Sequence, residues 1–301
     1  MSVDTVKIAR FRIDGKEHYG IVENGKVVSV TAISPFVKCS MPQTIEELIS
    51  HGSEDIKNFK DALKNVDEDI RAGATYSLKE AELLAPLVNP PKIICLGLNY
   101  YDHAAEQGAK IPDEPIIFMK PRTAITGPFK PIVKPSFVEK LDYEAELAIV
   151  IGKRCKNVSV EEARQCIFGY TVFNDVSARD IQFKDRQWTR GKSFDTFAPI
   201  GPYIVLADQV GDPSDLRIRT WVNDELRQDS STRNMVFNVY EIVHHLSRVM
   251  TLEPGDLIAT GTPAGVGVFM KPTPKFLRAG DRIVMEIECV GRLENYVVEE
   301  T

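Results

Sequence analysis

Two glutamates stand directly before a strongly apolar run, and this arrangement constrains the fold more than any other feature of the chain. Glu144 and Glu146 immediately precede Leu147–Ile151. Because side chains alternate along a β-strand, both carboxylates project from one face and only Ala145 points the other way. Two buried carboxylates this close repel, and burial favours a proton on one of them. A bound cation removes the conflict, so we expect a buried strand that carries a cation site.

A second apolar run offers a third ligand. The segment Phe168–Asn174 leads straight into Asp175. We predict that Asp175 joins Glu144 and Glu146 around one ion. Three hard carboxylates with no Cys or His nearby favour Mg²⁺ or Mn²⁺ over Zn²⁺.

Length and composition exclude several classes of protein. The chain has 301 residues, enough for one large domain and a smaller one. Its net charge is −6 and it has no basic cluster, which argues against a nucleic-acid partner. No apolar run is long enough to cross a bilayer, and the first residues lack a signal-peptide core. The five cysteines form no Cys-x-x-Cys pair, so neither a zinc site nor a disulfide framework is expected. We therefore expect a cytoplasmic protein.

The first part of the chain is predicted to form a small α+β accessory domain. Asx-Gly pairs at Asp14-Gly15 and Asn24-Gly25 suit tight hairpin turns between short strands. The strands are expected at Lys7–Ile13, His18–Val22 and Lys26–Val30, followed by helices at Thr44–Ser50 and Glu54–Lys64. A proline-rich stretch over residues 85–91 is the best candidate for a boundary, which divides the chain into residues 1–88 and 89–301.

Many short apolar runs separated by Pro and Gly characterise the larger part. Helical patterns are few there, at Val160–Ile167 and Val239–Met250. This pattern predicts an α+β chain with a mostly β core, either barrel-like or a sandwich. Strict β-α-β alternation is absent, which argues against a Rossmann domain. Gly191-Lys192-Ser193 resembles the end of a phosphate-binding loop, but Arg186 stands where that loop needs its first glycine.

Among the five histidines, His103 is the one with a carboxylate at helical spacing in a candidate active-site segment. It lies at the start of an expected short helix, and Glu106 follows three residues later on the same helical face. A carboxylate beside an imidazole fixes its tautomer and prepares it as a general base. From spacing alone, an ordinary solvated helix pair is the better interpretation.

Hydrogen-bond donors gather just after Asp175. Arg179, Gln182 and Lys192 could hold a substrate carboxylate or carbonyl beside the cation, although each could equally be an ordinary ion-paired residue. Thr262 lies in Ala259–Pro263, which ends an expected strand with amides and hydroxyls that could frame an oxygen anion. A plain glycine turn explains the glycine of that segment but not its two threonines.

Five blocks of sequence, in order from about Lys92 to near the C-terminus, resemble the fumarylacetoacetate hydrolase (FAH) family. The blocks are Asn99-Tyr100-Tyr101-Asp102-His103, Glu144-x-Glu146, Asn174-Asp175-Val176-Ser177-Ala178-Arg179-Asp180, Gly191-Lys192-Ser193-Phe194-Asp195 and Thr260-Gly261-Thr262-Pro263-Ala264-Gly265-Val266-Gly267. The region before them resembles the family's small accessory domain only loosely.

The resemblance implies an FAH-type mixed β-sandwich or rolled-sheet core, a homodimer and an Mg²⁺ or Mn²⁺ centre. It makes Glu144, Glu146 and Asp175 the metal ligands and His103–Glu106 a catalytic pair on a segment that closes as a lid, in place of the solvated pair that spacing favours. The remaining matches are Arg179, Gln182, Lys192 and Thr262 as substrate-contacting positions, with Lys192 also counted as catalytic.

The expected function is metal-assisted hydrolysis of a carbon–carbon bond in a 2,4-dioxo acid (an acylpyruvate) through a pyruvate enolate. Oxaloacetate decarboxylation or tautomerisation needs the same enolate without an attacking water. Isomerisation of a hydroxydienedioate and dehydration of a sugar acid are also compatible with the scaffold that the resemblance implies. A metal-binding module without turnover is the alternative from another class, and the His103–Glu106 pair argues against it.

Overall fold

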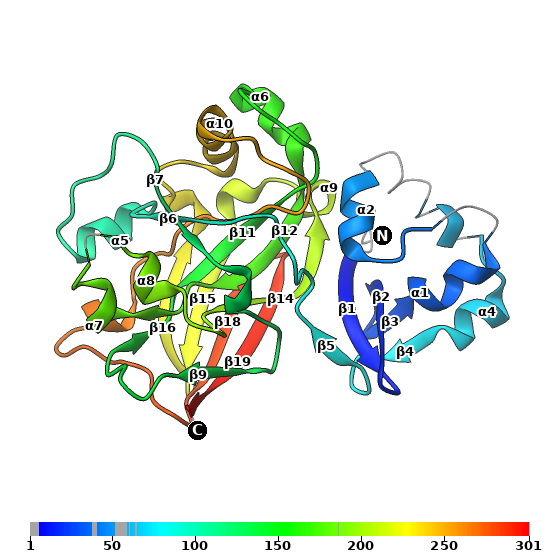
Figure 1. Ribbon diagram of the computed structural model, residues 1–301, viewed down its shortest axis with the longest axis horizontal. Helices are drawn as coiled ribbons and strands as arrows, with labels where there is room; N and C mark the ends of the chain where they lie inside the picture. The colour runs from blue at the N-terminus through cyan, green and yellow to red at the C-terminus, as the bar shows by residue number, and fades with distance from the viewer. Residues whose placement is uncertain are drawn as a thin grey trace.

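The computed structural model describes residues 6–37, 41–51, 59, 61–63, 65–185 and 187–300, and its described part is built mainly from β-sheet (Figure 1). The largest sheet follows the order β4-β3-β2-β1-β14-β12-β11-β17-β6-β7, with β5 beside β1 and β8 beside β14. A five-stranded sheet follows the order β16-β15-β18-β19-β9, and β10 pairs with β13 in a short ribbon. The mostly β prediction is confirmed. Among the described residues, the strand order of neither large sheet returns to its first strand, so the barrel alternative was wrong.

The first three strands form close to where the sequence predicted them, except that Val30 begins a helix instead of ending the third strand. Two further strands, at Thr75–Ser77 and Glu82–Leu84, were not predicted. Positive φ at Asp14, Gly15, Asn24 and Gly25 gives both hairpins the left-handed turns that Asx-Gly pairs supply. The strands are β1 Lys7–Ile13, β2 Lys16–Glu23, β3 Lys26–Ser29, β4 Thr75–Ser77 and β5 Glu82–Leu84. The helices here are α1 Val30–Ile33, α2 Ile45–His51 and α4 Glu68–Gly73. The helix expected at Glu54–Lys64 lies largely outside the described residues.

The second part of the chain supplies most of the sheet strands. Those of the large sheet are β6 Ile93–Gly97, β7 Ile116–Lys120, β8 Ile125–Thr126, β11 Ala145–Ile151, β12 Ile167–Asn174, β14 Ala198–Leu206 and β17 Leu257–Ala259. The five-stranded sheet has β9 Pro131–Lys134, β15 Arg217–Val222, β16 Glu225–Ser231, β18 Arg282–Ile287 and β19 Gly291–Glu299, and the ribbon has β10 Leu141–Asp142 and β13 Ser177–Ala178.

Helices of this part are short, with one exception. They are α5 Tyr101–Glu106, α6 Val160–Ala163, α7 Arg179–Gln182, α8 Thr189–Lys192, α9 Ala207–Val210 and α10 Val239–Val249, with 3₁₀ turns η1 Ser34–Phe36, η2 Arg122–Ala124, η3 Arg164–Cys166, η4 Pro213–Asp215, η5 Thr232–Asn234 and η6 Gly267–Phe269. The predicted helix Val160–Ile167 therefore ends early and continues as a 3₁₀ turn, because Ile167 already begins β12.

Two apolar cores lie on opposite faces of β11. Leu147, Ile149 and Ile151 pack into the core that the large sheet shares with the five-stranded sheet and α10. Ala148 and Val150 pack on the other face, in the core that reaches the N-terminal helices. Both faces of this strand are buried, which explains why its sequence is a continuous apolar run.

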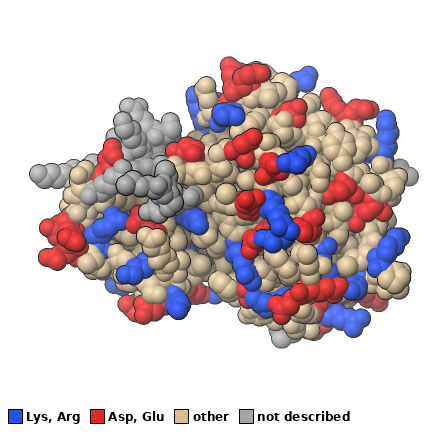
Figure 2. All heavy atoms as spheres, turned by 180° about the vertical axis from the view of Figure 1, so that it is seen from behind, with Lys and Arg blue, Asp and Glu red and all other residues tan. Residues whose placement is uncertain are grey.

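The N-terminal strands continue the large sheet, because β1 pairs antiparallel with β14. Figure 1 shows β1 next to the strands of the second part, with β2, β3 and β4 farther from them. The division into residues 1–88 and 89–301 stays a prediction. On the face drawn in Figure 2, basic and acidic side chains are interspersed, and neither sign covers a large continuous area. None of the helices in the described ranges is long and apolar enough to cross a membrane.

Candidate metal centre and cavity

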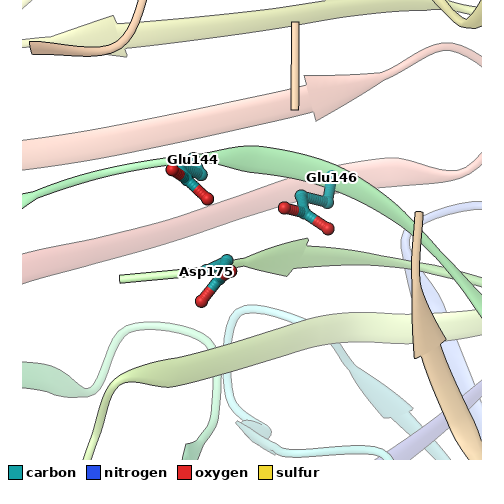
Figure 3. A group of neighbouring side chains, drawn as sticks. All are labelled: Glu144, Glu146 and Asp175. Atoms are coloured by element: carbon teal, nitrogen blue, oxygen red, sulfur yellow. The ribbon is translucent and has the colours of Figure 1, made fainter. Parts of the chain in front are cut away.

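The pairing of β11 with β12 assembles the predicted acidic triad. Ala145 pairs with Asn174, so the residues just before β11 and just after β12 lie side by side, and Asp175 N donates a 2.9 Å hydrogen bond to Glu144 O. Glu146 shares its face of β11 with Ala148 and Val150. Glu144, Glu146 and Asp175 are all buried, and one oxygen of each lies within 4.8 Å of the others (Figure 3).

Glu146 has the environment expected of a metal ligand. Its Oε2 accepts a 2.8 Å hydrogen bond from Gly261 N, whereas its buried Oε1 has no hydrogen-bond partner among the described residues. Burial, followed by the negative charges of Asp175 and Glu144, raises the pKa of the Glu146 carboxyl well above its usual value. A divalent cation would ligate the free oxygen and offset both charges. The oxygen-only donor set fits Mg²⁺ or Mn²⁺.

Lys192 lies between two of the three acids. Its Nζ donates to Glu144 Oε2 at 2.8 Å and to Asp175 Oδ2 at 2.6 Å, and it lies 4.9 Å from the centre of the Phe118 ring. Burial opposes ionisation of Glu144, but the Lys192 and Arg179 charges outweigh it and lower the pKa of that carboxyl. The lysine expected at the substrate therefore contacts the acidic triad directly in this structure.

Arg179 and Gln182 lie on α7 beside Glu144. Arg179 donates hydrogen bonds to Asp142 Oδ2 through Nε at 2.9 Å and to Gln182 Oε1 through Nη1 at 2.9 Å, and its Nη2 forms an ion pair with Glu144 Oε1 at 2.7 Å. Each nitrogen of the Arg179 guanidinium therefore contacts a protein oxygen. The side-chain oxygen of Gln182 accepts from Arg179, and no hydrogen bond of its amide nitrogen is seen among the described residues. Both residues line the same cavity.

The His103–Glu106 pair lies on α5, and His103 lines the same cavity. His103 Nδ1 lies 2.7 Å from Glu106 Oε1, and Glu106 Oε2 accepts a 3.0 Å hydrogen bond from Gly265 N. The two side chains are only 10% and 16% exposed, so they are not a solvated helix pair. Because the carboxylate engages Nδ1, the tautomer with a proton on Nδ1 leaves Nε2 as the basic nitrogen.

One cavity of about 70 Å³ brings the two groups of residues together. His103 and Glu144 both line it, so the imidazole and one carboxylate of the acidic triad share one space, whereas Glu106, Glu146 and Asp175 are not among its lining residues. The remaining predicted site residues on its wall are Arg179, Gln182, Lys192 and Thr262. Leu96, Phe118, Trp188 and Phe269 supply apolar wall. A carboxylate, an imidazole and fixed hydrogen-bond donors around one cavity can polarise a bound carbonyl group and move a proton.

Two charged residues of this region were missed by the sequence analysis. Lys120 is fully buried: its Nζ lies 2.7 Å from Asp175 Oδ1 and donates to the carbonyl oxygens of Val176, Lys192 and Phe197. Asp102 accepts from Ser230 Oγ at 2.6 Å, which ties α5 to β16. The only sequence signal for either residue was its position: Lys120 ends an apolar run and Asp102 precedes His103.

Comparisons with known proteins agree with this architecture. The family model described as "Fumarylacetoacetate (FAA) hydrolase C-terminal" matches residues 92–298, and the model described as "Rv2993c-like, N-terminal" matches residues 6–51. An oxaloacetate tautomerase of Xenopus laevis is 45% identical over 92% of this chain and 84% of its own length.

Two solved structures are similar over nearly the whole chain. The fumarylacetoacetate hydrolase of Exiguobacterium antarcticum has a TM-score of 0.83 at 41% identity, covering 98% of this chain and 100% of that one. The maleylpyruvate hydrolase of Sphingobium sp. SYK-6, in complex with manganese(II) and pyruvate, has a TM-score of 0.78 at 33% identity and the same coverage. The matched model spans well over half of the sequence, and the chain belongs to the fumarylacetoacetate hydrolase family.

Proposed function

We propose that the protein is an enzyme that transfers a proton at C3 of a small 2-oxo acid, with the keto–enol tautomerisation of oxaloacetate as the leading reaction. The observation that carries the proposal is the cavity that His103 and Glu144 line together, with Lys192, Gln182 and Thr262 as hydrogen-bond donors around it. A relative named as an oxaloacetate tautomerase, 45% identical over 92% of the chain, supports the same choice.

Glu144, Glu146 and Asp175 would hold Mg²⁺ or Mn²⁺, and the solved relative with manganese(II) and pyruvate supports this assignment. A divalent cation there supplies Lewis-acid stabilisation of the negative charge that develops on an enolate oxygen. Lys192 and Gln182 would donate hydrogen bonds to substrate oxygens. Arg179 would add positive charge and hold Gln182 and Glu144 in place, through the 2.9 and 2.7 Å contacts described above.

His103 would act as the base. Its Nε2 removes the proton from C3, and the electron pair of the broken C–H bond enters the enolate. Return of the proton to the enolate oxygen gives the enol, and the reverse steps give the ketone. Glu106 stabilises the imidazolium through its contact with Nδ1, and Gly265 N holds Glu106.

Hydrolysis of a carbon–carbon bond in a 2,4-dioxo acid is the second candidate. The same dyad could deprotonate a water instead of a carbon, and the solved structures named as hydrolases favour it. In that reaction the water oxygen bonds to the distal carbonyl carbon. The bond between C3 and C4 then breaks, and pyruvate leaves as an enolate that is protonated at C3. Decarboxylation of oxaloacetate needs neither the water nor the base.

The test compares oxaloacetate, acetylpyruvate and fumarylpyruvate with Mg²⁺, with Mn²⁺ and with chelator. We expect metal-dependent interconversion of keto and enol oxaloacetate, followed by enol absorbance, and a drop of about 10²-fold or more in His103→Ala. His245→Ala is the matched control, because His245 packs on Phe237 and does not line the cavity. Turnover of acetylpyruvate or fumarylpyruvate, without turnover of oxaloacetate, would establish hydrolysis instead. Unchanged turnover in His103→Ala would exclude the His103–Glu106 pair from catalysis.

We also propose a homodimer in the cytoplasm, as the sequence analysis expects. Sedimentation of the purified protein would test the first point, and fractionation of the source cells the second. A monomer at micromolar concentration would contradict the dimer.

A further inference from the structure

Gln228 is a buried amide beside the cavity that none of the roles above uses. It lies in β16, it is fully buried, and all of its hydrogen-bonding groups are engaged. Its Oε1 accepts from Ala145 N at 3.1 Å and from Thr220 Oγ1 at 2.8 Å. Its Nε2 donates to Thr262 Oγ1 at 2.8 Å and to Pro263 O at 2.9 Å. A buried amide with four partners is held in one orientation.

Two backbone groups fix that orientation without ambiguity. The amide N–H of Ala145 can only donate, so the Gln228 atom facing it must be the oxygen. The carbonyl of Pro263 can only accept, so the Gln228 atom facing it must be the nitrogen. The opposite assignment of the side-chain amide would place two donors together and two acceptors together.

The consequence falls on Thr262. Because Thr262 Oγ1 faces the NH₂ group of Gln228, its oxygen accepts and its own proton must point elsewhere. Within the described residues, no protein group accepts a hydrogen bond from this hydroxyl. Thr262 is 4% exposed and lines the cavity, so the proton is available to an occupant of that cavity.

We infer that Gln228 is a positioning residue that makes Thr262 a hydrogen-bond donor into the cavity, so that the bound molecule must present an acceptor oxygen there. The inference rests on the proposed function, in which that oxygen belongs to the carboxylate or carbonyl of a 2-oxo acid.

Gln228 also connects the donor to the acidic triad. Ala145, which donates to Gln228 Oε1, stands between Glu144 and Glu146 on β11. The same side chain therefore sets the separation between the Thr262 hydroxyl and the strand that carries two of the three acids. A shift of Gln228 would therefore move both Ala145 and the Thr262 hydroxyl.

The experiment measures oxalate binding to the full-length protein loaded with Mg²⁺, by titration calorimetry. Oxalate is the probe because it presents the vicinal oxygens of a 2-oxo acid. Thr262→Val should weaken binding about tenfold, since a hydrogen bond to a charged group is lost, and Thr262→Ser should keep most of it. Gln228→Met should weaken oxalate binding when Thr262 is present. In the double variant with Thr262→Val it should cause little further loss, because Gln228 acts through the Thr262 hydroxyl.

Asn295→Leu is the matched control for loss of a buried amide. Asn295 donates to Gly127 O and Lys130 O and does not line the cavity. A merely structural effect lowers the number of binding sites per chain, whereas the inferred role changes Kd, and calorimetry separates the two. If Gln228→Met does not fold, the comparison of Thr262→Val with Thr262→Ser still decides whether Thr262 donates.

Equal affinity in wild type, Thr262→Val and Thr262→Ser would overturn the inference, as would fully additive losses in Gln228→Met/Thr262→Val. Oxalate binding that depends on the Thr262 hydroxyl, without turnover of any oxo acid, would support the inference and count against the proposed reaction. Failure of the Mg²⁺-loaded wild type to bind oxalate would overturn both.

Discussion

The ammonium group of Lys192 lies 2.6 Å from Oδ2 of Asp175, inside the acidic triad rather than apart from it. Its second contact, 2.8 Å to Glu144 Oε2, makes it a bridge between two oxygens that a metal ion would also need. Lys192 thus neutralises the buried acids in the metal-free chain. A divalent cation held by these acids would bring like charges together, and Lys192, which already lines the cavity, could then donate to a substrate oxygen instead.

Replacing Lys192 by methionine should therefore have opposite effects on metal binding and on catalysis. Affinity for Mg²⁺ should rise about tenfold or more, because a competing positive charge is removed. Turnover should fall about 10²-fold or more, because a donor at the cavity is lost. The metal-free protein should lose about 1.5–3 kcal/mol of unfolding free energy, because Glu144 and Asp175 each lose one buried cationic partner but keep another, Arg179 and Lys120 respectively. Calorimetry and urea denaturation with and without Mg²⁺ measure these effects. Lys156→Met, at an exposed lysine that donates to Arg248 O, is the control. Weaker Mg²⁺ binding in Lys192→Met would contradict the prediction.

Glu146→Gln should abolish tight metal binding and leave the fold intact. The amide oxygen of glutamine can still accept from Gly261 N, which Glu146 Oε2 does at 2.8 Å, but a charged ligand oxygen is lost. We expect Mg²⁺ and Mn²⁺ affinity to fall about 10²-fold or more, with metal-free stability unchanged or higher because acid–acid repulsion decreases. Thermal unfolding against metal concentration measures both quantities. Glu241→Gln, in the N-terminal cap of α10, is the control. An unchanged metal response in Glu146→Gln would exclude this carboxylate as a ligand.

The acidic triad could be predicted from the sequence because its geometry is local. The two-residue repeat of a strand places Glu144 and Glu146 on one face, and the buried strand that ends just before Asp175 is the neighbour with which β11 pairs. The cavity wall could not be predicted in the same way. Gln228 lies 34 residues from Thr262 and in a strand, Glu225–Ser231, that has almost no apolar run to reveal it. Its partners are set by the pairing of sheets, which the sequence does not display.

The fold was predicted with a similar division between local and distant contacts. Hairpin turns, strand positions and the longest helix depend on neighbouring residues, and β1 Lys7–Ile13 was predicted to the residue. Pairing of β1 with β14 joins residues almost 200 positions apart, for example Lys7 with Val205, and has no sequence signature. The same reason hid Lys120, whose ammonium reaches Asp175 from another strand of the large sheet.

Helix α5 is attached to β16 through Asp102, and releasing it should loosen the His103–Glu106 pair. Asp102 Oδ2 accepts from Ser230 Oγ at 2.6 Å, and Oδ1 accepts from His103 N at 2.8 Å. In Asp102→Ala or Ser230→Ala we expect faster amide hydrogen exchange over residues 101–106 and turnover reduced about tenfold, because the base is less well placed. Ser231→Ala is the control, since Ser231 bonds to Asp215 instead. Unchanged exchange over residues 101–106 in both variants would show that this attachment does not hold the helix.

Gly265→Ala should disrupt the other support of the dyad. Gly265 has φ +101°, and a Cβ there would lie 2.1 Å from Arg227 O, so the backbone that presents Gly265 N to Glu106 would have to move. Gly280 is the matched control: its φ is +92°, but a Cβ there would meet nothing within 4 Å. We expect Gly280→Ala to cost about 1 kcal/mol of unfolding free energy from backbone strain alone. Gly265→Ala should cost about 3 kcal/mol or more and lower turnover of the folded fraction, because Glu106 loses its fixed position. Urea denaturation and active-site titration give the two values. Equal losses in the two alanine variants, with full turnover in both, would show that close packing at Gly265 does not support the dyad.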